Sequence, residues 1–289
     1  MEARISIRSA AVVLCVVLLP LTAVSCGGKS STASKTKPVS RPGLAVANSW
    51  SLDDQTHQEP MVVPGVSATS PKTLFVAYIA SDSGQGPASG GPPLDGKVQS
   101  VEGGGLVWTR RVEAHLSITG EPSIAEIWTA FSPTSKSPFT ITVVRNNDNG
   151  AVTLCDNYEG GSGPDIANGM VFIQAITGAD PKNPVGATAV AGVGKISGKV
   201  APASVALTTT HPGSLVAAVG SDWSDPAPRT IPAGQVMLHE DESTPNGDNY
   251  WVQGLPGAVV MPGPVMLSVS APTDDDCNMA AVEILRAPG

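Results

Sequence analysis

The densest group of titratable side chains in the sequence is His239-Glu240-Asp241-Glu242. Glu240 and Glu242 are two residues apart, so a β-strand would place both carboxylates on one face. Glycosidases use such a pair, one group as acid and the other as base or nucleophile. In sandwich glycosidases, however, apolar residues separate the carboxylates, whereas here the charges are consecutive and lead into the turn residues 243–247. We therefore expect a solvated strand end, with a hydrolase using Glu240 or Glu242 as the alternative.

Other chemistry-bearing patterns are sparse. The four histidines show no metal-ligand spacing, and the sequence has no Gly-x-Ser-x-Gly elbow. Asp274, Asp275 and Asp276 form an acidic loop before an apolar segment, and sandwich loops of this kind supply carboxylates and carbonyls to Ca²⁺. Solvated acidic loops are commoner. We therefore expect no cofactor, with calcium at Asp274, Asp275 and Asp276 as the exception to test.

Trp223 lies between Asp222 and Asp225, directly after an apolar segment. A loop tryptophan beside carboxylates is typical of a surface that binds a sugar or a protein, with the ring as anchor. The sequence therefore predicts Trp223 as a binding anchor and Asp222 and Asp225 as polar contacts. The alternative is that the indole folds over the end of the domain as part of its core.

The chain contains four cysteines, Cys15, Cys26, Cys155 and Cys277. The first two lie in the N-terminal segment described next, which leaves Cys155 and Cys277 as an even pair. In an oxidising compartment such a pair predicts a disulfide. It would close a loop of about 120 residues, for which chain entropy gives on the order of 4–5 kcal/mol. Two separate buried thiols are the alternative.

The N-terminus has the order of a secretory signal. Arg4 and Arg8 precede an apolar run from Ala10 to Leu21, and Ala23-Val24-Ser25-Cys26 follows. This segment resembles the bacterial lipoprotein signal, although Ala23 stands where Leu is commonest. The resemblance implies that residues 1–25 are removed and that Cys26 is acylated as the new N-terminus. It also implies an extracytoplasmic protein with a lipid anchor in the cell membrane.

Two other readings of the N-terminus remain open. A bilayer span needs about 20 apolar residues, and the run here is shorter and contains Pro20, which disfavours an uncleaved anchor. A plain secreted protein that keeps Cys26 as a thiol is the second alternative. Residues 26–43 are rich in Lys, Ser, Thr and Pro, so we expect them to form a flexible tether.

The charge balance excludes one class of partner. Six of the 17 basic residues and one of the 25 acidic residues precede Leu44, so residues 44–289 carry 11 basic and 24 acidic side chains, a net charge of −13. A body this acidic does not attract phosphate backbones, so we expect no nucleic-acid binding. The partners that remain are the membrane, through the lipid, and an envelope glycan or protein.

From Leu44 onward the sequence alternates between short apolar segments and turns, with 31 Gly and 26 Pro in the whole chain. This pattern predicts a single all-β domain over 44–289, a jelly-roll-like antiparallel β-sandwich. The expected strands are 44–47, 73–80, 106–112, 123–131, 139–145, 151–155, 170–176, 205–209, 214–220, 235–239, 250–254, 265–270 and 279–285.

These strands repeat in one order. Segments 73–82, 106–112, 127–129, 139–144 and 169–176 match 214–222, 235–239, 250–252, 265–269 and 278–285. We therefore predict two five-strand pseudo-repeats, interleaved in one sandwich because neither half alone would bury its apolar residues. Chance similarity between β-strands is the alternative.

The segments LFVAYIASD, AEIWTAFSP, VALTTTHPGSLVAAVGSDW and AAVEIL resemble a module of exported bacterial surface proteins that also occurs in phage tail proteins. The resemblance implies a jelly-roll-like sandwich and no established activity. The function expected from the sequence is thus a cell-envelope lipoprotein that acts as a non-catalytic binding or structural module.

Overall fold

The computed structural model describes residues 43–54, 59–81, 96–115, 123–145, 168–194, 201–222, 226–243, 248–274 and 276–288. These residues form fifteen β-strands and no helix, so the all-β prediction is confirmed. Across these ranges, no helix is long and apolar enough to cross a membrane. Every paired strand runs antiparallel to its neighbours.

The first half of the domain contains two sheets. The five-stranded sheet has the order β1-β8-β3-β6-β5, with β1 Ala45–Asp54, β8 Gly169–Thr177, β3 Thr73–Ser81, β6 Ile124–Ser132 and β5 Trp108–Ala114. The three-stranded sheet has the order β2-β7-β4, with β2 Met61–Ala68, β7 Lys136–Arg145 and β4 Val98–Gly103. An apolar core lies between these two sheets.

The second half repeats this plan. Its five-stranded sheet has the order β12-β13-β11-β15-β9, with β12 Val236–Ser243, β13 Asp248–Gly254, β11 Leu215–Asp222, β15 Cys277–Ile284 and β9 Val185–Val193. Its outer sheet pairs β10 Ser204–Thr208 with β14 Pro264–Ser268. A second core fills the space between them.

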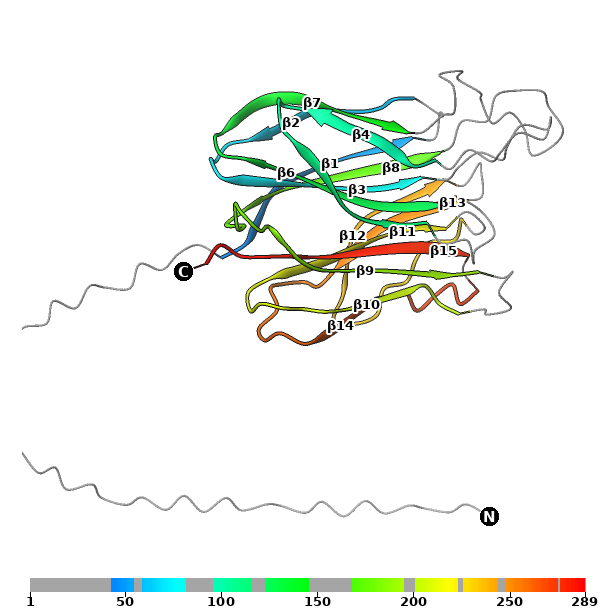
Figure 1. Cartoon of the computed structure of the whole chain (residues 1–289). Helices are drawn as coiled ribbons and strands as arrows, with labels where there is room; N and C mark the ends of the chain where they lie inside the picture. Colours follow the sequence, from blue (N-terminus) through cyan, green and yellow to red (C-terminus); the bar gives the residue numbers. More distant parts are fainter. Residues whose placement is uncertain are drawn as a thin grey trace, which may run out of the picture. The chain divides into compact units, whose positions relative to one another are not determined.

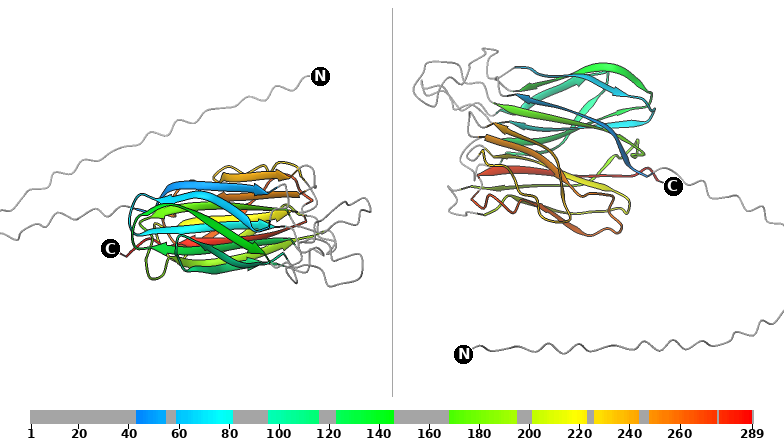
Figure 2. Two further views of the ribbon diagram at one scale, coloured as in Figure 1. Left: turned by 90° about the horizontal axis from the view of Figure 1, so that it is seen from above. Right: turned by 180° about the vertical axis from the view of Figure 1, so that it is seen from behind.

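The two five-stranded sheets also pack on each other, through a third core to which both halves contribute. The result is four layers: β2-β7-β4, the first five-stranded sheet, the second five-stranded sheet and β10-β14 (Figures 1 and 2). The halves are therefore stacked rather than interleaved as expected. Both belong to one compact unit, Arg41–Gly289.

The layering explains why the central strands are apolar along their whole length. In β3, Leu74, Val76 and Tyr78 face the middle core, whereas Phe75 and Ala77 face the outer core of the first half. A strand covered on both faces has no solvent side and so shows no alternation. The outer strand β7 does alternate, because Ile141 and Val143 are buried and Thr140 is exposed.

The predicted repeat has a structural counterpart. The matched strands β3 and β11 lie at the centre of their sheets, with β6 and β13 on one side and β8 and β15 on the other. β5 and β12 are both edge strands, and β7 and β14 both lie in the outer layers. Among the described residues, the equivalent of β4 in the second half is not a full strand. In its place, one isolated bridge joins Thr230 and Ala271.

The sequence did not predict β2, β4 and β9. β2 contains Pro64 and Gly65, which are tolerated because β2 is an edge strand with an irregular register. β9 is an edge strand built mainly of Ala, Gly and Val, without an alternating pattern. β1 runs to Asp54, well beyond the predicted 44–47. The strand predicted at 151–155 lies outside the described residues.

The domain has two distinct ends along its strands. At the first, which we call the Gly43 end, the described chain both begins and ends. The C-terminal segment is held there because the Ala287 amide donates to the Gly178 carbonyl at 2.9 Å. Gly178 has φ +80°, and a Cβ there would contact the Gly43 carbonyl within 2.5 Å. At the opposite end, β1, β3, β7 and β11 finish at Asp54, Ser81, Arg145 and Asp222. We call this the polar end.

Candidate functional site

Arg145 organises the polar end of the first half. Its side chain is fully buried, and its Nε donates to Glu59 Oε2 at 2.8 Å while its backbone amide donates to Glu59 Oε1 at 2.9 Å. Nη1 donates to Ser81 Oγ at 3.1 Å and to the Asn168 carbonyl at 3.0 Å. Nη2 lies 3.6 Å from Asp54 Oδ2. One guanidinium therefore holds together the ends of β1, β3, β7 and β8.

A second group of polar side chains joins the two halves. Asn168 Nδ2 donates to Asp248 Oδ2 at 2.9 Å, and the Tyr250 hydroxyl donates to the same oxygen at 3.1 Å. Burial raises the pKa of Asp248, and the nearby Asp241 carboxyl raises it further, although these two hydrogen bonds act against the shift. The site therefore favours a protonated Asp248 more than water does.

Serine side chains at the same end link the two five-stranded sheets. The Ser123 hydroxyl donates to the Ser221 carbonyl at 3.3 Å, and the Ser221 hydroxyl donates to the Ser81 carbonyl at 3.4 Å. Asn278 Nδ2 donates to the Ser123 carbonyl at 2.6 Å. Small polar side chains allow the sheets to approach here, and each of these groups is satisfied across the layer boundary.

Arg229 plays the corresponding part in the second half. Its Nη2 lies 2.8 Å from Asp222 Oδ2, and both side chains are fully buried. Its guanidinium stacks over the Trp251 ring at 5.1 Å from the centroid. Trp251 in turn lies against Gly220, where a Cβ would collide with the indole. Arg229 is thus held by its ion pair with Asp222 and by stacking on Trp251. The position of the Trp251 ring leaves no room for a side chain at Gly220.

This geometry corrects the role expected for Asp222. The sequence suggested a polar contact on an exposed loop, but Asp222 is fully buried and paired with Arg229. Its carboxylate stabilises the end of β11 instead of facing a ligand. Trp223 and Asp225, the other two members of that predicted site, lie outside the described residues.

The predicted carboxylate pair falls on β12. Glu240 Oε1 accepts the Arg229 amide at 2.6 Å and Asn249 Nδ2 at 3.1 Å, so this carboxylate is held in the structure. Glu242 is exposed. His239 stacks on Phe172 at 5.3 Å between ring centroids, and its Nε2 lies 2.6 Å from Asp53 Oδ1. The cluster therefore connects β12 to β1 and to the segment at Arg229.

The calcium and disulfide predictions are only partly covered by the described residues. Asp274 is exposed and Asp276 is buried, whereas Asp275 lies outside the described part of the chain. Within the described ranges, no three His, Cys, Asp or Glu side chains are grouped to hold a metal ion. Cys277 is buried at the start of β15, but Cys155 and Cys26 are not among the described residues. The disulfide and the lipidation of Cys26 thus stay predictions.

A further buried carboxylate lies in the first half, on β6. Glu126 accepts the Val98 amide at 2.9 Å and the Trp128 indole N–H at 2.7 Å. Burial raises the pKa of Glu126 to about 7, against the opposing effect of these two hydrogen bonds and of Arg110, which lies 3.8 Å away. Glu126 is therefore poised to gain or lose a proton near neutral pH.

The sequence did not predict Arg145, Asn168 or Asp248 as site residues. Each stands beside a polar turn segment, so sequence position alone assigns it to a solvated loop. The one available signal was Arg145 at the end of the alternating segment 139–145, at a position in phase with the buried residues Ile141 and Val143. An arginine at an inward-facing position requires buried carboxylate partners, and that reasoning predicts a polar cluster.

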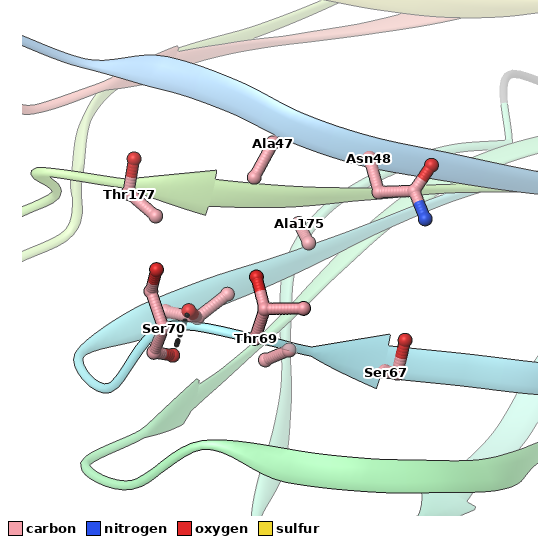
Figure 3. Close-up of a pocket in the computed structure, with 9 residues that line it drawn as sticks. Ala47, Asn48, Ser67, Thr69, Ser70, Ala175 and Thr177 are labelled. Carbon is pink, nitrogen blue, oxygen red and sulfur yellow. Dashed lines mark hydrogen bonds between the residues drawn. The ribbon is translucent and has the colours of Figure 1, made fainter.

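A small hollow lies at the Gly43 end between β1 and the turn after β2. It has a volume of about 80 Å³ and is lined mainly by small side chains such as Ala47, Ser67 and Thr177 (Figure 3). Thr73 Oγ1 donates to the Ser70 carbonyl at 2.8 Å beside it. Ligand pockets usually measure about 300–1,000 Å³, so this hollow is too small for a metabolite.

The polar end therefore consists of two buried guanidinium groups, of Arg145 and Arg229, and a larger number of carboxylate, amide and hydroxyl groups that pair with them and with one another. Such an arrangement fixes the strand ends at Asp54, Ser81, Arg145 and Asp222. No family model, no curated protein and no solved structure matches this chain.

Proposed function

We propose that this protein is a cell-envelope lipoprotein whose sandwich acts as a non-catalytic binding or structural module. Cys26 carries the lipid, residues 27–43 form the tether, and the polar end carries the contact surface. The resemblance of residues 1–26 to a lipoprotein signal supports the anchor. The partner would be an envelope glycan or a protein.

One observation carries this proposal, namely that the chain enters the domain at the Gly43 end. β1 runs from Ala45, opposite Thr177, to Asp54, opposite Gly169, so the tether and the polar end are separated by the length of a strand. Ten residues of strand span about 30 Å. In a domain tethered at Gly43, the polar end is thus about 30 Å farther from the attachment point than the Gly43 end.

The buried ion pairs supply the rigid base that such a surface needs. Binding residues are commonly borne on loops whose ends are held by a stable scaffold. Arg145 and Arg229 hold the strand ends from which these loops continue. Trp223 follows the fixed Asp222 directly in sequence, and we assign Trp223 as the anchor residue.

Two substitutions test the proposal. Cys26→Ser should remove the protein from the detergent phase after detergent partitioning, because the acylated sulfur is lost.

Trp223→Ala should abolish retention on a glycan array or in an envelope pull-down and leave the melting temperature nearly unchanged. Met266→Ala, at an exposed apolar residue of β14, is the control for Trp223→Ala and should bind as the unmodified protein does. Unchanged partitioning of Cys26→Ser would contradict the lipid anchor. A large loss of melting temperature in Trp223→Ala would show that Trp223 belongs to the core and would contradict its role as the binding anchor.

A further inference from the structure

The two five-stranded sheets enclose a second, much larger cavity at the Gly43 end. Its volume is about 430 Å³, within the range of small-molecule sites. Its walls come from both halves: Ile176 of β8 and Tyr78 of β3 on one side, Ala217 of β11 and Leu238 of β12 on the other. The cavity is therefore a gap in the middle core.

The chemistry of the walls is nearly uniform. No lining residue is charged, and apart from Tyr78, Gln174 and backbone atoms the lining is aliphatic. A charged ligand would lose its hydration there without compensation, which is costly. A neutral aliphatic ligand would instead gain about 25 cal/mol for each Å² of apolar surface that it buries.

Gln174 provides one unused hydrogen-bond donor in this apolar setting. The residue is 6% exposed, and its Oε1 accepts the Tyr78 hydroxyl at 3.3 Å. This assignment leaves the Nε2 amide of Gln174 without a partner among the described residues, although Gln174 lines the cavity. A ligand oxygen in the cavity could accept a hydrogen bond from this amide, which contributes about 0.5–1.5 kcal/mol for a typical net hydrogen bond.

The cavity opens to solvent at the Gly43 end of the domain. Toward the polar end, His239 stacks on Phe172 and bonds Asp53, which joins β12 to the first sheet. At the Gly43 end the lining residues are exposed, with Val46 on β1 and the turn Pro256-Gly257-Ala258 after β13. A ligand can therefore enter between β1 and this turn.

We propose that this cavity binds one neutral, mainly aliphatic molecule that carries a single hydrogen-bond acceptor, such as a medium-chain ketone or ester. At about 30 Å³ for each water-sized group, the volume suits about 14 non-hydrogen atoms. The acceptor oxygen bonds Nε2 of Gln174, and the aliphatic chain extends toward the mouth at Val46. This site depends on neither Trp223 nor the lipid on Cys26.

The test uses 2-decanone as probe and the full chain with Cys26→Ser, so that no acyl group of its own can enter. Methyl NMR titration should show saturable shifts at Ile176, Leu238 and Ile284, which line the cavity. Methyl groups of the outer cores, such as Ile141 and Leu267, should not move. Absence of saturable shifts up to the solubility limit, or shifts in the outer cores only, would overturn the proposal.

Three variants locate the site and its donor. Ala258→Trp, at the exposed mouth, should weaken 2-decanone binding at least tenfold. Val260→Trp, 87% exposed on the same turn but outside the lining, is its matched control and should bind normally. Gln174→Leu should weaken 2-decanone binding about tenfold, as expected for one lost hydrogen bond, and leave decane binding unchanged. Equal binding in Ala258→Trp and Val260→Trp, or equal loss of both probes in Gln174→Leu, would refute the assignment.

Discussion

The two ends of the space between the five-stranded sheets are built in opposite ways. At the polar end, charged and hydrogen-bonding side chains fill the space and leave the halves joined by Asn168, Asp248 and three serines. At the Gly43 end, aliphatic side chains surround a cavity of about 430 Å³. The same pair of sheets therefore supports a rigid, polar base at one end and a hollow, apolar chamber at the other.

The difference shows how each kind of site is stabilised. Buried charges cost desolvation energy, so the polar end requires carboxylates beside Arg145 and Arg229. An apolar cavity requires no partners, but it forgoes packing contacts with the atoms that would fill it. Removing a group should thus be severe at the polar end, whereas adding volume should be tolerated at the Gly43 end.

Removal of the Arg145 side chain should have the largest effect. Arg145→Met leaves the carboxylates of Asp54 and Glu59 without their guanidinium, and breaking one partner of a buried pair costs about 3–5 kcal/mol. Chemical denaturation would measure the loss in the free energy of unfolding. Lys97→Met, which breaks a partly exposed pair with Glu113, is the control and should cost about 0–1 kcal/mol. Equal losses would mean that the polar end is not organised by Arg145.

Titration of Glu126 should give the next largest effect. Burial raises its pKa from 4.5 to about 7 in the folded protein, so folding favours its protonated form. Its contribution to stability is therefore fully present below about pH 4.5 and is lost as the pH rises through 7, a change of about 3 kcal/mol. Chemical denaturation at several pH values would measure this. Between pH 4.5 and 8, the free energy of unfolding of the unmodified chain should fall by about 3 kcal/mol more than that of Glu126→Gln. Parallel pH profiles would contradict it.

Leucine substitutions at two neighbouring alanines would compare the cavity with a filled core. Ala217 lines the cavity, whereas Ala218, the next residue of β11, is buried in the outer core of the second half. Ala218→Leu should destabilise the fold by about 1–3 kcal/mol, because a packed core cannot accept the added volume. Ala217→Leu should change the free energy of unfolding by less than about 1 kcal/mol. A similar loss in both variants would mean that the cavity does not accommodate a larger side chain.

Much of the fold was predictable because strand periodicity and burial are recorded locally in the sequence. The apolar segment 73–80 predicted a strand, and the match between 73–82 and 214–222 predicted that the two segments are equivalent, as β3 and β11 are. The stacking of the halves was not predictable. β3 and β11 are apolar on both faces, which shows that both faces are covered but does not show which sheet covers which face.

The functional surfaces were less predictable, because they depend on residues brought together from both halves. Asp222 was predicted to be exposed since it precedes Trp223 in a polar segment, and only the fold places Arg229 beside it. The cavity has no local sequence signature at all. Leu44, Tyr78, Gln174 and Leu255 look like ordinary strand residues, and the gap between them arises from how the two sheets pack.

We propose that the Gly43 end faces the membrane and the polar end faces away. Fluorophores on single added cysteines at Val260→Cys and Glu242→Cys would test it, since both positions are exposed. The Val259 amide donates to the Ser214 carbonyl next to the start of β11. Glu242 instead lies opposite Asn249, the partner of Asp222 at the end of β11. The strand from Ser214 to Asp222 spans about 26 Å. With the lipidated protein in vesicles that carry an acceptor on the lipid headgroups, energy transfer should be clearly stronger from position 260 than from position 242. Equal transfer, or stronger transfer from position 242, would contradict this orientation.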